Sequence, residues 1–334
     1  MIHLVMPDVQ GGVHDFACIL QAEMGPDMVH LVPLSVGNAG EWQIQAGDSV
    51  VLQMSGYGFS KRGAPLWLLH EMERRRHKIK RFGVFFHELY AFGPPWKSAF
   101  WISPMQRHIV RRLAEMSDLW MTSRDGSAQW LWQYAGHKPH TVLPVFSTIG
   151  EPQLLPAARA RKRSLMVFGS AELRTVTYRT AGRELFQWAK RQSLEIYDVG
   201  SPVTDLQVMD ALETNGVTQH GRLEADKLSE LMRGTQFGVI AYPTNYIAKS
   251  SVFAAYCAHG LCPMILSNGG YAPSDGLLAG QHYLAGVPIG LVDADKAQQT
   301  GEVAWRWYQS HGVASHIAKL RQFLGVPTLG EGRC

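Results

Sequence analysis

The chain has 334 residues, of which 46% are hydrophobic and 18% are charged, and its formal net charge at pH 7 is +4. These proportions exclude a disordered chain, and the length exceeds one usual core, so we expect two domains of about 150 residues each. The sequence has no signal-peptide pattern and no run of about 18 uncharged apolar residues, so we expect a cytoplasmic protein without a membrane span.

The first half of the chain alternates predicted strands with predicted helices. We expect strands at residues 2–7, 29–34, 49–54, 82–87, 119–122 and 141–146, and helices at residues 13–23, 66–77, 99–116 and 127–134. Such alternation is typical of a parallel sheet with helices on both faces. Residues 1–150 are therefore predicted to form a Rossmann-like domain.

The same alternation restarts after residues 151–163, which contain two prolines and four basic residues and are expected to form a linker. We expect strands at residues 164–168, 194–199 and 237–241, helices at 180–191, 225–232 and 252–259, and a last helix at 303–324. A further strand is expected after the helix at 252–259, in the stretch that ends at Leu266. This predicts a second Rossmann-like domain at residues 164–302 and a C-terminal helical segment at 303–334. The predicted fold class is α/β, with two doubly wound domains that face a cleft, because ligands of such sheets bind beyond the carboxyl ends of the strands.

A polar step, Lys249-Ser250-Ser251, stands where the helix at 252–259 is expected to begin. Ser250 or Ser251 is a good N-cap, and the first turn of a helix offers free N–H groups and a partial positive charge. Lys249 adds a full charge, so the step predicts a phosphate-binding site. The alternative is that the serine is only a cap and Lys249 a solvated loop residue.

Other polar residues of the second half also follow predicted strands. They are Gly169 and Ser170 with Arg174, then Gly221, Arg222 and Leu223, and finally Tyr242. Basic groups and a helix start that converge on one cleft suit a diphosphate. The alternative for Arg174 is a surface ion pair.

In the first half, the residues that follow predicted strands include a titratable pair, His87 and Glu88. An irregular Gly-Pro-Pro loop comes next, so the pair is expected to point into a cleft, although a structural hydrogen bond is the alternative for His87. Further residues expected on this side are Gly11, Gly12, His14, Tyr57 and Tyr90.

Charge is distributed unevenly along the chain. Residues 61–112 carry twelve basic side chains and three acidic ones, and Trp96, Phe100 and Trp101 lie beside Lys97. This combination predicts a face that rests on anionic lipid head groups, with a merely solvated charged face as the alternative. No recognition motif for nucleic acid occurs, so we expect no nucleic-acid partner.

Several passages, taken together and in order, resemble the GT-B glycosyltransferases, and are similar to the large family 4 group of bacterial polysaccharide and cell-surface glycan assembly. They are QGGVHDFA, SGYGFSKRGAPLWLL, FFHELYAFGPPWKSAFWISPMQRHIVRRLAEMSD, TSRDG, VFGSAELR, HGRLEADKLSELMRGTQFGVIAYP and SSVFAAYCAHGLCPMIL. The resemblance spans almost the whole chain.

The resemblance implies a hexosyltransferase-like enzyme that moves a sugar from a nucleotide-diphosphate donor to a glycan or lipid-linked acceptor, without a metal or other cofactor. It implies that residues 221–223 border the base and that residues 249–251 hold the diphosphate, with Arg174 assisting. It implies that Gly11, Gly12, His14, His87 and Glu88 face the transferred sugar or the acceptor, and that the C-terminal helix crosses back to the first domain. If configuration inverts, Glu88 or His87 is the candidate base. Asp293 and Asp295 form a short Asp-x-Asp pattern, which we interpret as a solvated loop and not as a metal site.

One departure concerns two glutamates, eight positions apart, that retaining members carry. Ile247 and Ala255 stand at the corresponding positions here. Retention and inversion therefore both stay open, as do the donor base, the sugar and the acceptor. Two other functions remain as alternatives: a non-catalytic nucleotide-sugar-binding subunit and a nucleotide-sugar epimerase. For the transferase, the expected location is the cytoplasm, with the inner face of the membrane as its working surface.

Overall fold

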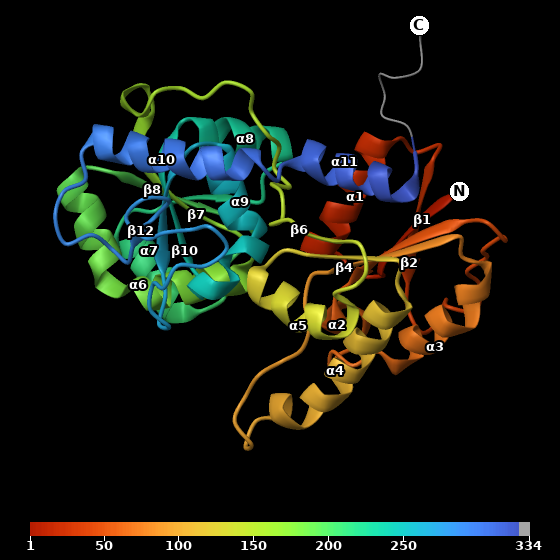
Figure 1. Ribbon diagram of the computed structural model, residues 1–334. Helices are drawn as coiled ribbons and strands as arrows, with labels where there is room; N and C mark the ends of the chain where they lie inside the picture. The colour runs from red at the N-terminus through yellow and green to blue at the C-terminus, as the bar shows by residue number, and fades with distance from the viewer. Residues whose placement is uncertain (327–334) are drawn as a thin grey trace, which may run out of the picture. The chain divides into compact units, whose positions relative to one another are not determined.

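The computed structural model describes residues 1–326, and the chain divides into two compact units (Figure 1). The first unit consists of Met1–Pro144 together with the described residues from Val313 onward, and the second is Val145–Gly312. These bounds differ from the expected ones, because the segment expected to be a linker packs within the second unit. For example, the amide of Ala158 donates to Gln298 Oε1 at 3.0 Å.

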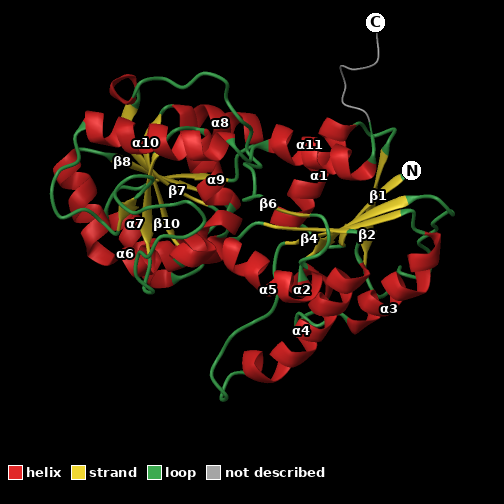
Figure 2. Ribbon diagram, in the orientation of Figure 1, coloured by secondary structure: helices red, strands yellow, loops and turns green. Residues whose placement is uncertain are grey.

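The first unit is a parallel sheet covered by helices (Figure 2). Its elements are β1 (Ile2–Pro7), α1 (Gly12–Met24), β2 (Val29–Leu34), β3 (Ser49–Met54), α2 (Gly56–Phe59), α3 (Leu66–Arg75), η1 (Arg76–Lys78), β4 (Arg81–Phe86), α4 (Ser98–Met116), β5 (Leu119–Thr122), α5 (Asp125–Ala135), β6 (His140–Val142) and α11 (Val313–Leu324). The strand order is β2-β1-β3-β4-β5-β6. Every residue of β1 and β3 is buried, as the continuous apolar runs of a parallel sheet require.

The second unit repeats this architecture. Its elements are η2 (Ala158–Ala160), β7 (Lys162–Phe168), α6 (Ala171–Gln192), β8 (Glu195–Val199), α7 (Leu206–Thr214), β9 (Thr218–Gly221), α8 (Ala225–Arg233), β10 (Thr235–Ala241), η3 (Thr244–Lys249), α9 (Ser251–Ala258), β11 (Cys262–Leu266), β12 (Leu284–Ala285) and α10 (Ala294–Gln309). The strand order is β12-β11-β10-β7-β8-β9, and every pair is parallel.

Each sheet has a point at which the order of strand addition reverses. In the first sheet this point lies between β1 and β3, and in the second it lies between β7 and β10. The loops that leave two neighbouring strands at such a point diverge to opposite faces, which opens a crevice beyond the carboxyl ends of the strands. The two reversal points are therefore where ligands are expected.

Two of the expected helices have a different extent in the structure. The helix expected at 180–191 begins at Ala171, and a non-helical Gly182 (φ 55°, ψ −149°) interrupts it. Thr175 and Thr177 in its first half lower its intrinsic helix propensity, and their hydroxyls bond back to carbonyls one turn earlier. The helix expected at 303–324 is two helices, because the chain turns at residues 310–312 between α10 and α11.

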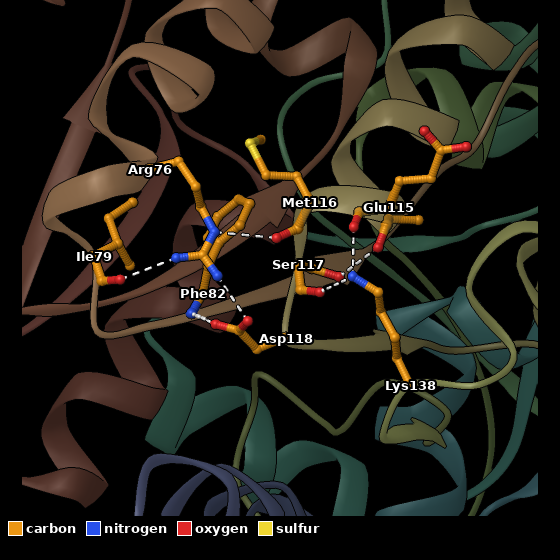
Figure 3. A network of polar contacts seen from close by, with 9 residues as sticks. Arg76, Ile79, Phe82, Glu115, Met116, Ser117, Asp118 and Lys138 are labelled. Atoms are coloured by element: carbon orange, nitrogen blue, oxygen red, sulfur yellow. Dashed lines mark hydrogen bonds and ion pairs between the residues drawn. The ribbon is translucent and has the colours of Figure 1, made fainter.

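Part of the basic run at residues 74–81 has a structural role at the amino edge of the first sheet. Arg76 pairs with Asp118 Oδ1 at 2.7 Å and donates to the carbonyl of Met116 at the end of α4, as Figure 3 shows. Asp118 Oδ2 accepts the amide of Phe82 at 2.8 Å. Arg75 is buried and pairs with Glu71. The run therefore contributes fewer solvated cations than its composition indicates.

Candidate functional site

Two capped helices begin side by side at the reversal point of the second sheet. Ser170 follows β7 and accepts the amide of Leu173 at 3.2 Å, which caps α6. Ser250 follows η3 and accepts the amide of Phe253 at 3.2 Å, which caps α9. The prediction of a serine N-cap before the helix at 252–259 is confirmed for Ser250.

Gly169 allows these two helix starts to come together. Its φ is +133°, a conformation that side-chain-bearing residues rarely adopt. A Cβ at this position would lie 3.0 Å from Leu173 Cδ2 in α6 and 3.3 Å from Val252 Cγ2 in α9. The loop after β7 therefore passes directly against the first turn of α9.

Of the two helix starts, that of α9 is the better binding site for an anion. Both helix starts present amide groups and the positive end of a helix dipole. Glu172 is exposed in the first turn of α6, where its charge opposes a second anion. Residues 251–254 of α9 contain no acid, and the half-buried Lys249 immediately precedes the cap, with its Nζ 5.7 Å from the centre of the Tyr246 ring.

Arg174 does not have the role predicted for it. It is 1% exposed, pairs with the buried Asp198 of β8, and donates to the carbonyls of Gly169, at 3.1 Å, and Ser201. Its guanidinium therefore joins the loops after β7 and β8 and is not presented to a ligand, so both the direct diphosphate contact and the alternative of a surface pair are wrong. Burial, followed by the Asp198 carboxylate, raises the pKa of Tyr178 well above its usual value, so the Tyr178 hydroxyl remains a donor to Asp198 at 3.0 Å.

The turn at residues 221–223 lies at the end of β9. Gly221 accepts the amide of Gly200 at 2.9 Å, and Arg222 is exposed and donates to Ser201 Oγ at 2.7 Å. Leu223 lines a pocket of about 370 Å³ that runs along α8 to Lys162, at the amino end of β7. That pocket lies beside β8 and β9 and not at the carboxyl edge of the sheet. Of the turn at residues 221–223, the backbone and the Arg222 side chain are the parts that lie at the carboxyl edge. Tyr242 follows β10 and is half-buried.

The two positions at which the sequence resemblance would imply glutamates are buried in the core. Ile247 lies in η3 and is 1% exposed, and Ala255 lies in α9 and is fully buried. A carboxylate at either position would need a buried partner. The departure is therefore built into the packing around α9.

In the first unit, His87 and Glu88 follow β4 at the carboxyl edge. His87 Nε2 lies 2.9 Å from Gln53 Oε1, and its ring packs against Phe16 and Phe85. With the amide oxygen facing it, Nε2 is the donor of this hydrogen bond. Glu88 Oε2 lies 3.5 Å from the hydroxyl of Ser55. His87 is thus hydrogen-bonded within the first unit, as its alternative interpretation expected, and its side chain is half-buried.

Gln53 is the residue that the sequence reasoning missed. It is 0% exposed within β3, the strand beside β4, and it orients His87. The signal was a single amide in the apolar run SVVLQM. A polar side chain in a strand buried on both faces needs a partner, which in this case is the predicted site residue His87.

The remaining residues predicted in the first unit lie in three places. Gly11 and Gly12 form the start of α1, where a Cβ on Gly11 would meet nothing within 4 Å, and His14 lies in the first turn, 3.6 Å from Asp15. Tyr57 is exposed in α2, after β3. These residues border the reversal point between β1 and β3. Tyr90 instead packs on Trp130 of α5 beneath Arg107 of α4.

The Asp-x-Asp pattern has structural roles at the start of α10. Asp293 accepts the amide of Lys296 at 2.7 Å as the N-cap, and Asp295 pairs with Arg159 at 2.8 Å. The expectation of a plain solvated loop is corrected to a helix cap. Among residues 1–326, no helix is long and apolar enough to span a bilayer.

A cavity of about 610 Å³ in the first unit runs along the outer strand β2 as far as Asn38, with His3 and Asp48 at the amino edge of the sheet. Its polar groups bind one another: Trp42 Nε1 donates to His3 Nδ1 at 3.3 Å, and His3 Nε2 lies 3.1 Å from Asp48 Oδ2. The chemistry of the predicted site residues is at the other edge, so we do not assign a site to this cavity.

Comparison with known proteins identifies the fold. The sequence matches no protein-family model and no curated protein sequence. By structure, the chain is similar to an E. coli protein described as trehalose-6-phosphate bound with UDP-2-fluoro glucose (TM-score 0.59, 10% identity, covering 98% of this chain and 99% of that one). It is also similar to an alpha-glucosyltransferase in complex with UDP (TM-score 0.54, 10% identity, covering 97% and 99%).

A third similar structure is the pneumococcal O-GlcNAc transferase GtfA in complex with UDP and GlcNAc (TM-score 0.55, 13% identity, covering 86% of this chain). This chain spans 58% of the length of that protein. These neighbours are GT-B glycosyltransferases, and together with the two parallel six-stranded sheets they confirm the predicted α/β fold of two Rossmann-like domains. At these identities the likeness shows the fold alone, and similarity to the family 4 group stays a prediction.

Proposed function

We propose that the protein is a glycosyltransferase that uses a nucleoside-diphosphate sugar as its donor. The observation that supports this most directly is the pair of capped helix starts at the reversal point of the second sheet, with Lys249 before one of them. Transfer of the sugar leaves a diphosphate, whose added charge must be stabilised. A helix start contributes about 0.3–1 kcal/mol to an exposed anion and up to about 2 kcal/mol when partly buried, and Lys249 adds a full charge.

The first unit supplies the acceptor side in this proposal. Gly11, Gly12, His14 and Tyr57 border the reversal point of the first sheet, with His87 and Glu88 after the next strand. For an inverting reaction, Glu88 or His87 takes the proton of the acceptor hydroxyl. For a retaining reaction, His87 positions the sugar. The acceptor is a glycan or a lipid-linked saccharide of cell-surface polysaccharide synthesis, and no metal takes part.

We place the reaction in the cytoplasm, at the inner face of the membrane. Cys18, Cys257 and Cys262 are free thiols, which is typical of proteins in a reducing compartment. The fourth cysteine, Cys334, lies outside the described residues.

A nucleotide-sugar-binding subunit without catalysis is the second candidate. It is favoured by the burial of Ile247 and Ala255 in apolar packing. The second unit would then have a phosphate-binding site but not the two glutamate carboxylates that the sequence resemblance implies at these positions. Such a subunit binds the donor and releases no nucleotide.

Nucleotide release from a panel of sugar nucleotides, with and without lipid-linked acceptors, separates the candidates. A transferase releases nucleotide only with an acceptor, and chelator leaves the rate unchanged. Calorimetric donor binding without release identifies the binding subunit, and interconversion of the donor without acceptor identifies an epimerase. If no sugar nucleotide binds, the proposal is wrong.

A further inference from the structure

Large apolar side chains are exposed together at residues 92–105, which we call the aromatic arm. The exposed fractions are 66% for Phe92, 83% for Trp96, 44% for Phe100, 71% for Trp101 and 41% for Met105. In Figure 1 the loop before α4 and the first turns of α4 project from the rest of the first unit. The first buried residue of α4 is Ser103. The apolar side chains of the turn before it are therefore not buried in the core of the first unit. Exposed apolar patches of this kind mark interaction surfaces.

Cations border the aromatic arm, and acids are missing from the sequence around it. Residues 89–114 contain no Asp or Glu, whereas Lys97 and Arg107 are exposed. Gln106 accepts the amide of Ala91 at 2.7 Å and donates to the carbonyl of Arg62 at 3.1 Å. The exposed Arg62 and its neighbour Lys61 are thereby held beside the arm.

The aromatic arm has a defined conformation. Trp101 Nε1 donates to the carbonyl of Pro95 at 2.8 Å, which ties the helix to the loop before it. The Arg107 guanidinium lies 4.3 Å from the centre of the Tyr90 ring and 5.8 Å from that of Phe92. The arm is therefore ordered for contact before it meets a partner, which reduces the entropy lost on binding.

We propose that the aromatic arm docks the first unit on a bilayer that contains anionic lipids. Tryptophan and phenylalanine rings partition into the interface between head groups and acyl chains, and lysine and arginine beside them attract anionic head groups. Charge complementarity favours this occupant over another protein, because residues 89–114 carry basic side chains and no acidic one. The apolar tip favours it over nucleic acid.

Docking also specifies the acceptor class, an extension that rests on the proposed function. His87 and Glu88 directly precede the loop that carries the arm. A docked arm holds the start of that loop close to the lipid head groups. The acceptor saccharide is then one carried on a membrane lipid.

Vesicle binding by the full-length protein tests the docking. Co-sedimentation is measured with vesicles of phosphatidylcholine alone and of phosphatidylcholine mixed with phosphatidylglycerol. We expect binding to the anionic vesicles and at least an about tenfold fall in the partition coefficient for the Trp96→Ala/Trp101→Ala variant. The matched control is Trp132→Ala, since Trp132 is 56% exposed in α5 of the same unit, and it should bind like the wild type.

Charge is tested separately. Lys97→Glu should lower the partition coefficient by at least about fivefold, since each basic residue near an anionic surface contributes to binding on that scale. Lys78→Glu is the control, because Lys78 is exposed in η1, before the amino end of β4 and away from the arm. Exposed positions leave the fold intact, which circular dichroism checks.

Three outcomes would overturn the proposal: no binding to anionic vesicles, equal binding to neutral ones, or unchanged binding by the arm variants. A dimer in light scattering that the tryptophan variant abolishes would instead identify a protein interface, and salt-sensitive binding to RNA without vesicle binding a nucleic-acid one. Nucleotide release from the panel of sugar nucleotides is measured in parallel, with lipid-linked acceptors dissolved in detergent so that the reaction does not depend on vesicle binding. If neither the wild type nor any variant releases nucleotide, the proposed glycosyltransferase function is wrong, and the docking result is unaffected.

Discussion

Arg174 shows how a charged residue that follows a strand can be needed by the fold and not by the ligand. Its guanidinium is fully buried against Asp198 and reaches the carbonyls of Gly169 and Ser201. Its contacts therefore hold the loop after β7 against the loop after β8. Lys249, in contrast, precedes a helix start and is half-buried.

Removing the buried guanidinium should destabilise the second unit strongly. We expect Arg174→Met to lower the free energy of unfolding by about 3–5 kcal/mol, because Asp198 is left as an uncompensated buried charge. Urea unfolding measures this, and Arg174→Met/Asp198→Asn should recover part of the loss. The control is Arg179→Met, whose pair with Asp205 is largely exposed on the arginine side and should contribute less than about 1 kcal/mol. Equal losses for Arg174→Met and Arg179→Met would contradict this assignment.

Lys249→Ala should act on catalysis and leave stability nearly unchanged. Loss of one preorganised positive group at the leaving diphosphate should lower kcat for nucleotide release by about 10²–10³-fold. Lys227→Ala in α8 is the control, since Lys227 is exposed beside the outer strands. If Lys249→Ala releases nucleotide at the wild-type rate, the phosphate-binding site is not at the start of α9.

At the scale of elements, the strands were predictable because parallel strands buried on both faces have to be continuous apolar runs. β1, β2 and β3 have the predicted bounds, and β4 and β10 agree to within a residue or two. The early start of α6 was hidden because its cap and its β-branched first turns break the helical period. Gln53 and the burial of Arg174 depend on which strands become neighbours, and a local pattern does not contain that information.

At the scale of elements, the loop after β7 holds the starts of α6 and α9 side by side at Gly169. Gly169→Ala adds a Cβ 3.0 Å from Leu173 and 3.3 Å from Val252 in a conformation that disfavours any side chain, so the helix starts should move apart. We expect a loss of about 1–3 kcal/mol in stability and at least an about tenfold weaker nucleotide affinity by calorimetry. Gly216→Ala is the matched control: its φ is +63°, but its Cβ would meet nothing within 4 Å. If Gly216→Ala weakens nucleotide binding as much, backbone strain alone explains the effect.

At the scale of the whole molecule, each unit contains a buried neutral histidine. In the second unit, His259 Nδ1 donates to the carbonyl of Ala255 at 2.8 Å, and Nε2 lies 2.8 Å from the hydroxyl of Ser229. In the first, His316 Nε2 of α11 donates to the carbonyl of Pro144 at 2.9 Å. Burial lowers the pKa of both rings to about 4. Both units are therefore sensitive to acid in the same range.

The sign of the pH dependence follows from these two pKa values. An unfolded histidine has a pKa of about 6.5, so between about pH 6.5 and pH 4 the unfolded chain binds more protons than the folded one, and stability falls as pH falls. From pH 7 to pH 5 each histidine should remove about 2 kcal/mol, or about 4 kcal/mol for the two together. Urea unfolding at both pH values measures this. His316→Gln should reduce the pH-dependent loss by about 2 kcal/mol, whatever its own stability, and an unchanged loss would show that His316 does not titrate in this range.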